Sequence, residues 1–230
     1  MENEETPKVG AVIVAAGKSQ RMGGVDKVFA PLGGQPALAR VVDVFQRCHS
    51  VHQIVVVLSG SNLKQGQQLV ATHAWAKVTD VCPGGERRQD SVAAGLSRLT
   101  NCDWVVIHDG ARPLVTEALI DRGLEAAKET GAAVAAVPVT DTIKVAGEDG
   151  FVQGTPPRQN LWAAQTPQVF RFDIIAEAYR KVKPEVTDDA RLVEQLGYKV
   201  KLYMGAYENI KVTTPDDLVF AGVLWRKHES

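Results

Sequence analysis

Four short apolar runs, rich in valine, constrain the fold of this 230-residue chain more than any other feature. Runs of this length without polar interruptions favour strands that are buried on both faces, as in parallel sheets. The runs cover residues 9–15, 54–58, 104–107 and 132–137. Amphipathic stretches separate them, and these cover residues 37–48, 91–99 and 117–129. Strands therefore alternate with helices along the chain.

This alternation predicts right-handed βαβ units and an α/β fold of Rossmann-like type, with a mostly parallel sheet and helices on both faces. The length and the 45% apolar content suit one domain over residues 1–230. In such sheets ligands bind beyond the carboxyl ends of the strands. The loops that follow the strands are therefore where we expect the chemistry.

One segment, residues 140–158, departs from the alternation. Two β-prone stretches at 142–145 and 151–152 flank a turn that contains Asp149 and Gly150. This arrangement is typical of a β-hairpin. The segment carries too little apolar material to form a domain, so we expect a protruding arm that binds a partner.

Overall composition excludes several classes of protein. A formal net charge of -1 gives no general attraction to nucleic acid or to an acidic membrane. No window reaches the roughly 18 apolar residues of a membrane span. Residues 1–7 are polar and acidic, unlike a signal peptide, so we expect a flexible tail on a cytoplasmic protein. The three cysteines are too few and too scattered for a disulfide framework or a zinc site.

A glycine-rich, basic loop follows the first predicted strand. Glycines let backbone N–H groups approach phosphates closely, and cations add local positive charge. A Walker A loop would need glycine where Val12 stands, and the dinucleotide-binding register is also absent. We therefore expect a triphosphate-binding loop, the alternative being a solvated turn. Its glycines and cations are Gly17, Gly23, Gly24, Lys18, Arg21 and Lys27.

Residues 15–23 read AAGKSQRMG and are followed by Asp26 and Lys27. This segment resembles the L-x-A-G-x-G-x-R-M-(x)n-P-K signature of sugar-nucleotide pyrophosphorylases. Within that superfamily the chain resembles the 2-C-methyl-D-erythritol 4-phosphate cytidylyltransferases of the non-mevalonate isoprenoid pathway. Further matches, in family order, are residues 84–91 (GGERRQDS), 108–113 (HDGARP), 141–144 (DTIK), 166–168 (TPQ), 187–189 (TDD) and 209–213 (NIKVT).

The chain departs from the family pattern at two positions. Asp26 replaces the proline before the lysine, and Gly110 replaces a common alanine. Both changes keep the charged groups of the motifs, although we expect the first to loosen the loop.

The resemblance implies that the chain transfers a cytidylyl group from CTP to 2-C-methyl-D-erythritol 4-phosphate. The products would be 4-diphosphocytidyl-2-C-methyl-D-erythritol and pyrophosphate. Arg21 and Lys27 match the positions that stabilise the pentavalent transition state, a task that suits a planar guanidinium and a compact ammonium. Arg158 and Lys211 match those that orient the acceptor phosphate. On their own, Lys27 and Arg158 could also be ordinary surface residues.

Asp109 is the first candidate for binding Mg²⁺. It follows the run at 104–107, so its carboxylate is expected at the carboxyl edge of the sheet, and Mg²⁺ prefers oxygen ligands. The alternative is an aspartate that caps the next helix. Glu208 is the second metal candidate, with a surface glutamate as its alternative.

The remaining site residues divide between the two substrates. Small residues would let the backbone read the pyrimidine, although Ser91 or Asp90 could instead start a helix. The expected nucleotide-binding residues are Ala15, Ala16, Gly17, Lys18, Gly84, Gly85, Ser91 and Asp109. The expected acceptor-binding residues, by resemblance, are Ala111, Arg112, Thr142, Thr166 and Thr187.

The resemblance also implies a homodimer. In the family, the arm that carries the Thr142 and Arg158 positions reaches across a dimer interface, which agrees with the arm expected at 140–158. Rival hypotheses are a D-ribitol 5-phosphate cytidylyltransferase, a non-catalytic CTP-binding regulatory module, and a glycosyltransferase. The last usually carries Asp-x-Asp, whereas this chain has Asp109-Gly110-Ala111.

Overall fold

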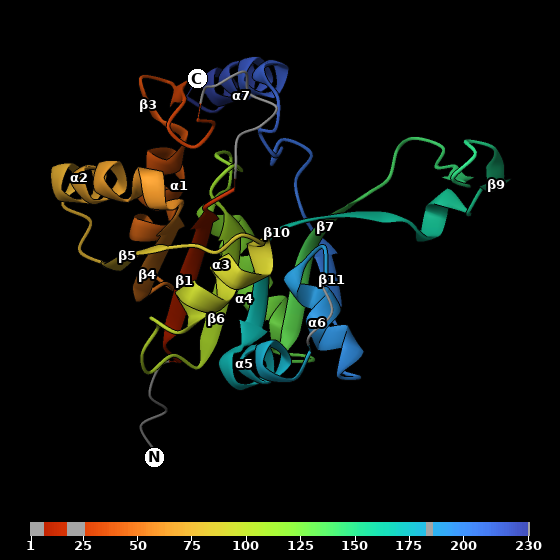
Figure 1. The fold of residues 1–230 in the computed structure, drawn as a ribbon, viewed down its shortest axis with the longest axis horizontal. Helices are drawn as coiled ribbons and strands as arrows, with labels where there is room; N and C mark the ends of the chain where they lie inside the picture. The colour runs from red at the N-terminus through yellow and green to blue at the C-terminus, as the bar shows by residue number, and fades with distance from the viewer. Residues whose placement is uncertain (1–6, 18–25, 183–185, 230) are drawn as a thin grey trace.

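The computed structural model describes residues 7–17, 26–182 and 186–229, and its centre is a seven-stranded sheet (Figure 1). The strand order is β11-β7-β10-β6-β1-β4-β5. The strands are β1 (Val9–Ala15), β4 (Gln53–Leu58), β5 (Val78–Pro83), β6 (Trp104–Asp109), β7 (Ala132–Pro138), β10 (Trp162–Arg171) and β11 (Lys201–Met204). Each of the four predicted runs forms a strand of this sheet.

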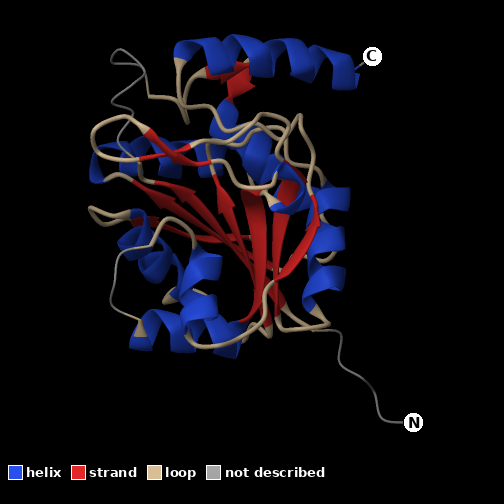
Figure 2. Ribbon diagram, turned by 90° about the vertical axis from the view of Figure 1, so that its right-hand side faces the viewer, coloured by secondary structure: helices blue, strands red, loops and turns tan. Residues whose placement is uncertain are grey.

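Helices cover both faces of the sheet, as Figure 2 shows. They are α1 (Ala37–Arg47), α2 (Leu63–His73), α3 (Arg88–Leu96), α4 (Glu117–Ala127), α5 (Phe172–Lys181) and α6 (Asp189–Gln195). The last helix, α7 (Pro215–Glu229), lies beyond the end of the sheet and packs against Leu32. Short elements complete the described chain: β2 (Pro31–Leu32), β3 (Gln35–Pro36), β8 (Val145–Ala146), β9 (Val152–Gly154), η2 (Gly60–Asn62) and η3 (Arg158–Asn160). The α/β fold with a mostly parallel sheet is confirmed.

Two apolar cores explain why the strands read as continuous apolar runs. Successive side chains of a strand point to opposite faces, so Val12 packs in one core and its neighbour Ile13 in the other. The core on one face includes α1 and α4, and the core on the other includes α3, α5 and α6. Both faces of a central strand are therefore buried, which explains the long apolar runs.

Strand β10 departs from the parallel arrangement, because it pairs antiparallel with both β6 and β7. The chain leaves the sheet after β7, forms the 140–158 segment and returns directly as β10. A return without a crossover helix brings the strand back in the opposite direction. No continuous apolar run marks this strand in the sequence, so it was not predicted.

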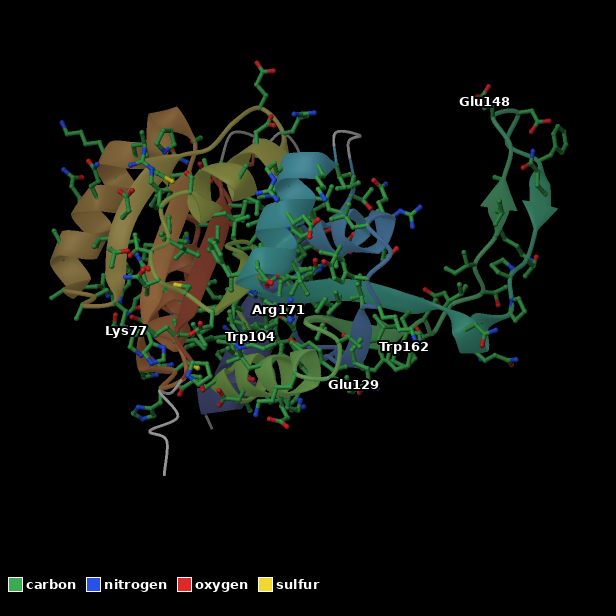
Figure 3. All side chains as sticks on the ribbon, turned by 90° about the horizontal axis from the view of Figure 1, so that it is seen from below. Lys77, Trp104, Glu129, Glu148, Trp162 and Arg171 are labelled. Carbon is green, nitrogen blue, oxygen red and sulfur yellow. The ribbon has the colours of Figure 1, made fainter. Side chains whose placement is uncertain are left out.

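The 140–158 segment projects from the body of the molecule, with Glu148 near its far end and Trp162 near its base (Figure 3). β8 and β9 pair antiparallel within it, and Gly150 takes a φ of 81° in the turn. The predicted hairpin strands are present but lie one to three residues further along the chain. Four of its apolar side chains are exposed, namely Ile143, Val145, Phe151 and Val152. Of the tail expected at 1–7, residues 1–6 lie outside the described chain.

The three cysteines are separate thiols, with Cys48 and Cys82 buried and Cys102 half-buried. Burial raises the pKa of each thiol above its usual value. None of the described helices has the length and apolar character that crossing a membrane requires.

The last helix, α7, begins with a reciprocal cap. The Asp217 carboxylate accepts hydrogen bonds from the backbone N–H groups of Thr213 and Thr214, and the Thr214 hydroxyl accepts one from the N–H of Asp217. Pro215 occupies the first helical position, where its lack of an N–H group costs nothing. This cap fixes the backbone just after Lys211, a predicted site residue.

Replacing Asp217 with alanine is expected to lower the free energy of unfolding by about 1 kcal/mol at neutral pH, because the helix loses its cap. Hydrogen bonds from Thr213 lower the pKa of Asp217 from 3.8 to about 2. The difference in the free energy of unfolding between the wild type and the variant should therefore be complete above about pH 4. It should disappear as the pH falls towards 2. Urea unfolding of both proteins across this range measures the difference, and a pH-independent difference would contradict the capping role.

Candidate active site

The carboxyl ends of β1 and β6 form the base of the candidate site. The two strands are paired in parallel with Val14 opposite Asp109, so the loops that follow them start side by side. A cavity lies at this edge, and we call it the nucleotide cavity. The predicted site residues that line it are Ala15, Ala16, Gly17, Lys27, Gly85, Ser91, Asp109, Ala111 and Lys211.

The glycine loop between β5 and α3 forms one wall of this cavity. The N–H of Gly84 donates to the carbonyl of Leu58 at 2.8 Å, and that of Gly85 to Ser91 Oγ at 3.2 Å. A Cβ atom on Gly84 would lie 2.4 Å from Ala16 Cβ and 2.5 Å from Ser91 Oγ. Glycine at 84 is therefore required for the loop to approach residue 16.

The start of α3 resolves the alternative roles of Asp90 and Ser91. Arg87 is the N-cap residue, and Asp90 Oδ2 accepts from the N–H of Arg87 at 3.2 Å in a capping box. Ser91 lies inside the first turn, where its buried hydroxyl donates to the carbonyl of Arg87 and accepts from Gly85. Asp90 caps the helix, whereas Ser91 shapes the glycine loop.

Asp109 is a buried carboxylate, 7% exposed, with three cations around it. Lys211 Nζ lies 2.8 Å from Oδ2, Arg88 Nε 3.3 Å from Oδ1, and Arg112 Nε 3.8 Å from Oδ2. Burial alone would raise the pKa of Asp109, but the nearby cations outweigh burial and hold this pKa well below its usual value. Asp109 is therefore ionised. It does not cap α4, which begins at Glu117 with Thr116 as its N-cap.

A magnesium ion fits the Asp109 carboxylate if the ion arrives bound to a triphosphate. Within the described ranges, no three His, Cys, Asp or Glu side chains gather closely enough to hold a metal ion. Mg²⁺ commonly binds through one or two carboxylates together with substrate phosphates and water. Asp109 suits that mode, since the surrounding cations would repel a bare ion but attract one that arrives with a triphosphate. Glu208 lines neither cavity of the site.

A second cavity lies next to the first, and we call it the acceptor cavity. Arg88, Asp109 and Lys211 line both cavities, so these three residues form their junction. Three predicted acceptor-binding residues line the acceptor cavity, namely Arg112, Thr166 and Thr187. Ala111 instead lines the nucleotide cavity.

A chain of buried hydrogen bonds fixes the backbone around Asp109. Its N–H donates to Thr166 Oγ1 at 3.0 Å, and Thr166 Oγ1 lies 3.1 Å from His108 Nδ1. Burial lowers the pKa of His108 to about 4, so the ring is neutral near pH 7. Its Nε2 lies 3.1 Å from the carbonyl of Arg112, an acceptor, so Nε2 carries the proton and Nδ1 accepts from the Thr166 hydroxyl.

The arm residues lie away from the cavities of their own chain. Arg158 and Thr142 line neither cavity, and Arg158 donates to the carbonyl of Thr140 at 2.5 Å. Both are exposed. The 140–158 segment that carries them projects from the body of the molecule (Figure 3). The structure of one chain therefore does not bring these two residues to the predicted site.

The basic loop is described in part. Lys18 and Arg21 lie outside the described residues. Asp26, which stands where the family has proline, accepts hydrogen bonds from the N–H of Val28 and from the amide of Asn62. These contacts hold Asp26 in place next to Lys27, whereas the loosening expected for the loop concerns residues 18–25, which lie outside the described residues.

Arg88 is a site residue for which the sequence predicted no role, although it belongs to the motif at 84–91. It belongs to the first turn of α3, directly after the glycine loop, and that position was the available signal. Gln165 and Gln168 also line the acceptor cavity and were not predicted. Their strand, β10, was itself not recognised in the sequence.

Comparison with known proteins identifies the family. The family model described as IspD: 2-C-methyl-D-erythritol 4-phosphate cytidylyltransferase matches residues 9–227. A protein of that name from Dehalococcoides mccartyi strain 195 is 55% identical over 96% of this chain and 97% of its own length. Another, from Caldanaerobacter subterraneus subsp. tengcongensis, is 46% identical over 95% of this chain and 99% of its own length.

Solved structures agree with these relatives. The 4-diphosphocytidyl-2C-methyl-D-erythritol synthase of Anaerococcus prevotii superposes with a TM-score of 0.86 at 29% identity, covering 96% of this chain and 97% of its own. The 2-C-methyl-D-erythritol 4-phosphate cytidylyltransferase of Thermus thermophilus gives a TM-score of 0.76 at 34% identity, with coverage of 95% and 99%. The chain therefore belongs to the 2-C-methyl-D-erythritol 4-phosphate cytidylyltransferase family of enzymes.

Proposed function

We propose that this enzyme transfers the cytidylyl group of CTP to 2-C-methyl-D-erythritol 4-phosphate, with Mg²⁺ as cofactor. The observation that carries this proposal is the junction of the two cavities at Arg88, Asp109 and Lys211. A nucleotide in one cavity and a phosphorylated polyol in the other would meet at this junction. Family membership supplies the identity of the two substrates.

The reaction is an in-line displacement at phosphorus. A phosphate oxygen of the acceptor forms a bond to the α-phosphorus of CTP, the bond from that phosphorus to the bridging oxygen breaks, and pyrophosphate leaves with the electron pair. The protein contributes mainly positioning and stabilisation of charge. Lys27 in the nucleotide cavity and Arg21 stabilise the charge that develops on the phosphates, and loss of such a contact typically costs about 3 kcal/mol of barrier.

The other residues of the two cavities bind the metal ion and the acceptor. Asp109 would hold the metal ion, which when bound neutralises part of the triphosphate charge. Lys211, at 2.8 Å from Asp109, orients the acceptor phosphate from the shared wall of the two cavities. Arg112 and Thr187, in the acceptor cavity, bind the acceptor.

The arm completes the site in a homodimer. Its exposed apolar side chains need a partner surface, and Arg158 and Thr142 lie away from their own cavities. In a two-fold dimer each arm would deliver these two residues to the acceptor cavity of the other chain. Arg158 would then orient the acceptor phosphate together with Lys211 of the partner chain.

The direct experiment measures pyrophosphate release with CTP, UTP, ATP and GTP, each with either 2-C-methyl-D-erythritol 4-phosphate or D-ribitol 5-phosphate. We expect turnover with CTP and the first acceptor, and none without Mg²⁺. Preference for D-ribitol 5-phosphate would assign the rival acceptor. Binding of CTP without pyrophosphate release would indicate a regulatory module.

Substitution of Gly84 with alanine is expected to weaken CTP binding about tenfold or more, because the new Cβ collides with Ala16 and Ser91. Overpacking of this kind costs about 1–3 kcal/mol. Gly60→Ala is the matched control, since a Cβ there meets no atom within 4 Å. Isothermal titration with CTP measures both variants, and equal affinities would show that the glycine loop does not contact the nucleotide.

Mixed dimers test the arm. Lys27→Ala and Arg158→Ala homodimers should each be nearly inactive, because every site lacks one group. In a mixed dimer one site has Lys27 of its own chain and Arg158 of the other, so random pairing should restore about a quarter of wild-type activity. Co-expression with two affinity tags isolates the mixed dimer, and an inactive mixed dimer would place Arg158 in the site of its own chain.

A further inference from the structure

The side chain of Arg88 lies between two carboxylates. Its Nε is 3.3 Å from Asp109 Oδ1, and a terminal nitrogen is 2.8 Å from Asp189 Oδ2. Asp189 is 1% exposed, and its other oxygen accepts a hydrogen bond from the Tyr179 hydroxyl. Arg88 therefore connects the junction of the cavities to a buried pair of residues on α5 and α6.

Asp189 belongs to the first turn of α6 but is not its N-cap. The N-cap of α6 is Asp188, whose carboxylate accepts from the N–H of Arg191 at 3.2 Å and from the Gln168 amide at 3.1 Å. Asp189 is the next residue, and its side chain turns inward to Arg88 and Tyr179. A buried charge is costly unless it is paired, so this carboxylate depends on Arg88.

The pair with Asp189 limits how Arg88 can contact Asp109. Arginine prefers to bind a carboxylate with two parallel N–H···O bonds. Here Asp189 holds one terminal nitrogen, so Arg88 approaches Asp109 through Nε, which points to Oδ1. The other oxygen, Oδ2, faces Lys211 at 2.8 Å.

The pKa shifts of Arg88 and Tyr179 agree with this geometry. Burial would lower the pKa of Arg88, but Asp189 and Asp109 outweigh it and raise that pKa above its usual value. Burial and the neighbouring Asp189 both raise the pKa of the Tyr179 hydroxyl. Tyr179 therefore stays protonated and acts as a hydrogen-bond donor to Asp189.

We propose that Asp189 and Tyr179 are positioning residues that hold Arg88 to one oxygen of Asp109 and leave the other oxygen, Oδ2, to Lys211 at the junction. This inference rests on the proposed function, because it assigns a task within the same site. Without the Asp189 charge, Arg88 would turn to bind both oxygens of Asp109. Lys211 would then share Oδ2 with Arg88, so the metal–triphosphate complex and the acceptor phosphate would still bind but would be poorly aligned for transfer.

The test is a double-mutant cycle on Arg88 and Asp189, measured as pyrophosphate release from CTP and 2-C-methyl-D-erythritol 4-phosphate. D189N should lower kcat about thirtyfold, with KM for either substrate changed less than about threefold, because the groups that bind the substrates remain. Y179F, which removes one hydroxyl, should lower kcat about threefold. In an R88M background, D189N should lower kcat no further, since no Arg88 remains to be positioned.

Two controls separate positioning from loss of fold. D173N removes another ion pair, that of Arg171 and Asp173 on the exposed start of α5, and should keep wild-type kcat. Urea unfolding and CTP titration of each variant give the folded fraction and the affinity for nucleotide. The affinity of D189N for CTP should stay within about threefold of wild type.

The outcomes distinguish the two proposals. A wild-type protein that releases no pyrophosphate overturns the proposed function, and the positioning role with it. If the wild type is active, wild-type kcat in D189N overturns the positioning role alone. The same holds if D189N and R88M reduce kcat by factors that multiply in the double variant, or if activity losses only follow the folded fraction. Y179F keeps the test decisive if D189N fails to fold.

Discussion

The buried carboxylate of Asp109 is the charge on which the arrangement of the site depends. An ionised group in the interior has to be compensated, and here the compensation comes from Arg88, Arg112 and Lys211. These cations belong to α3, to the loop after β6 and to the segment before α7. Because each must reach one carboxylate, the three segments are held together at the carboxyl edge of the sheet. The junction between the two cavities is the result.

Strand β10 links this edge to the projecting arm. Near its start it pairs with the end of β7, where the arm leaves the body, and further along it places Thr166 and Gln168 beside Asp109 and α6. Gln168 Oε1 accepts from the N–H of Ala190, and its amide donates to Asp188. The strand that returns from the arm therefore also supports the wall of the acceptor cavity.

Contacts in the structure explain how the chain accommodates its two departures from the family pattern, Asp26 and Gly110. Asp26 replaces the rigidity of proline with side-chain contacts to the N–H of Val28 and to Asn62. Gly110 packs against Ala15, where a Cβ atom would approach Ala15 Cβ to 2.8 Å. Both changes lie next to residues that line the nucleotide cavity, and neither removes a cation from it.

The sequence by itself determined the α/β class, the four central strands, the loops that carry the site and the family. Local patterns suffice for these, because strand burial, helix periodicity and glycine-rich loops are properties of neighbouring residues. It did not reveal β10, whose sequence contains Gln165, Thr166 and Gln168 and lacks a continuous apolar run. Those polar side chains are stable in the sheet because Asn209, His108 and Asp188 form hydrogen bonds with them, and these partners are distant in the chain. The bridge of Arg88 to Asp109 and Asp189 was likewise decided by the tertiary structure, since it joins residues 21 and 101 positions apart, a contact that no local pattern encodes.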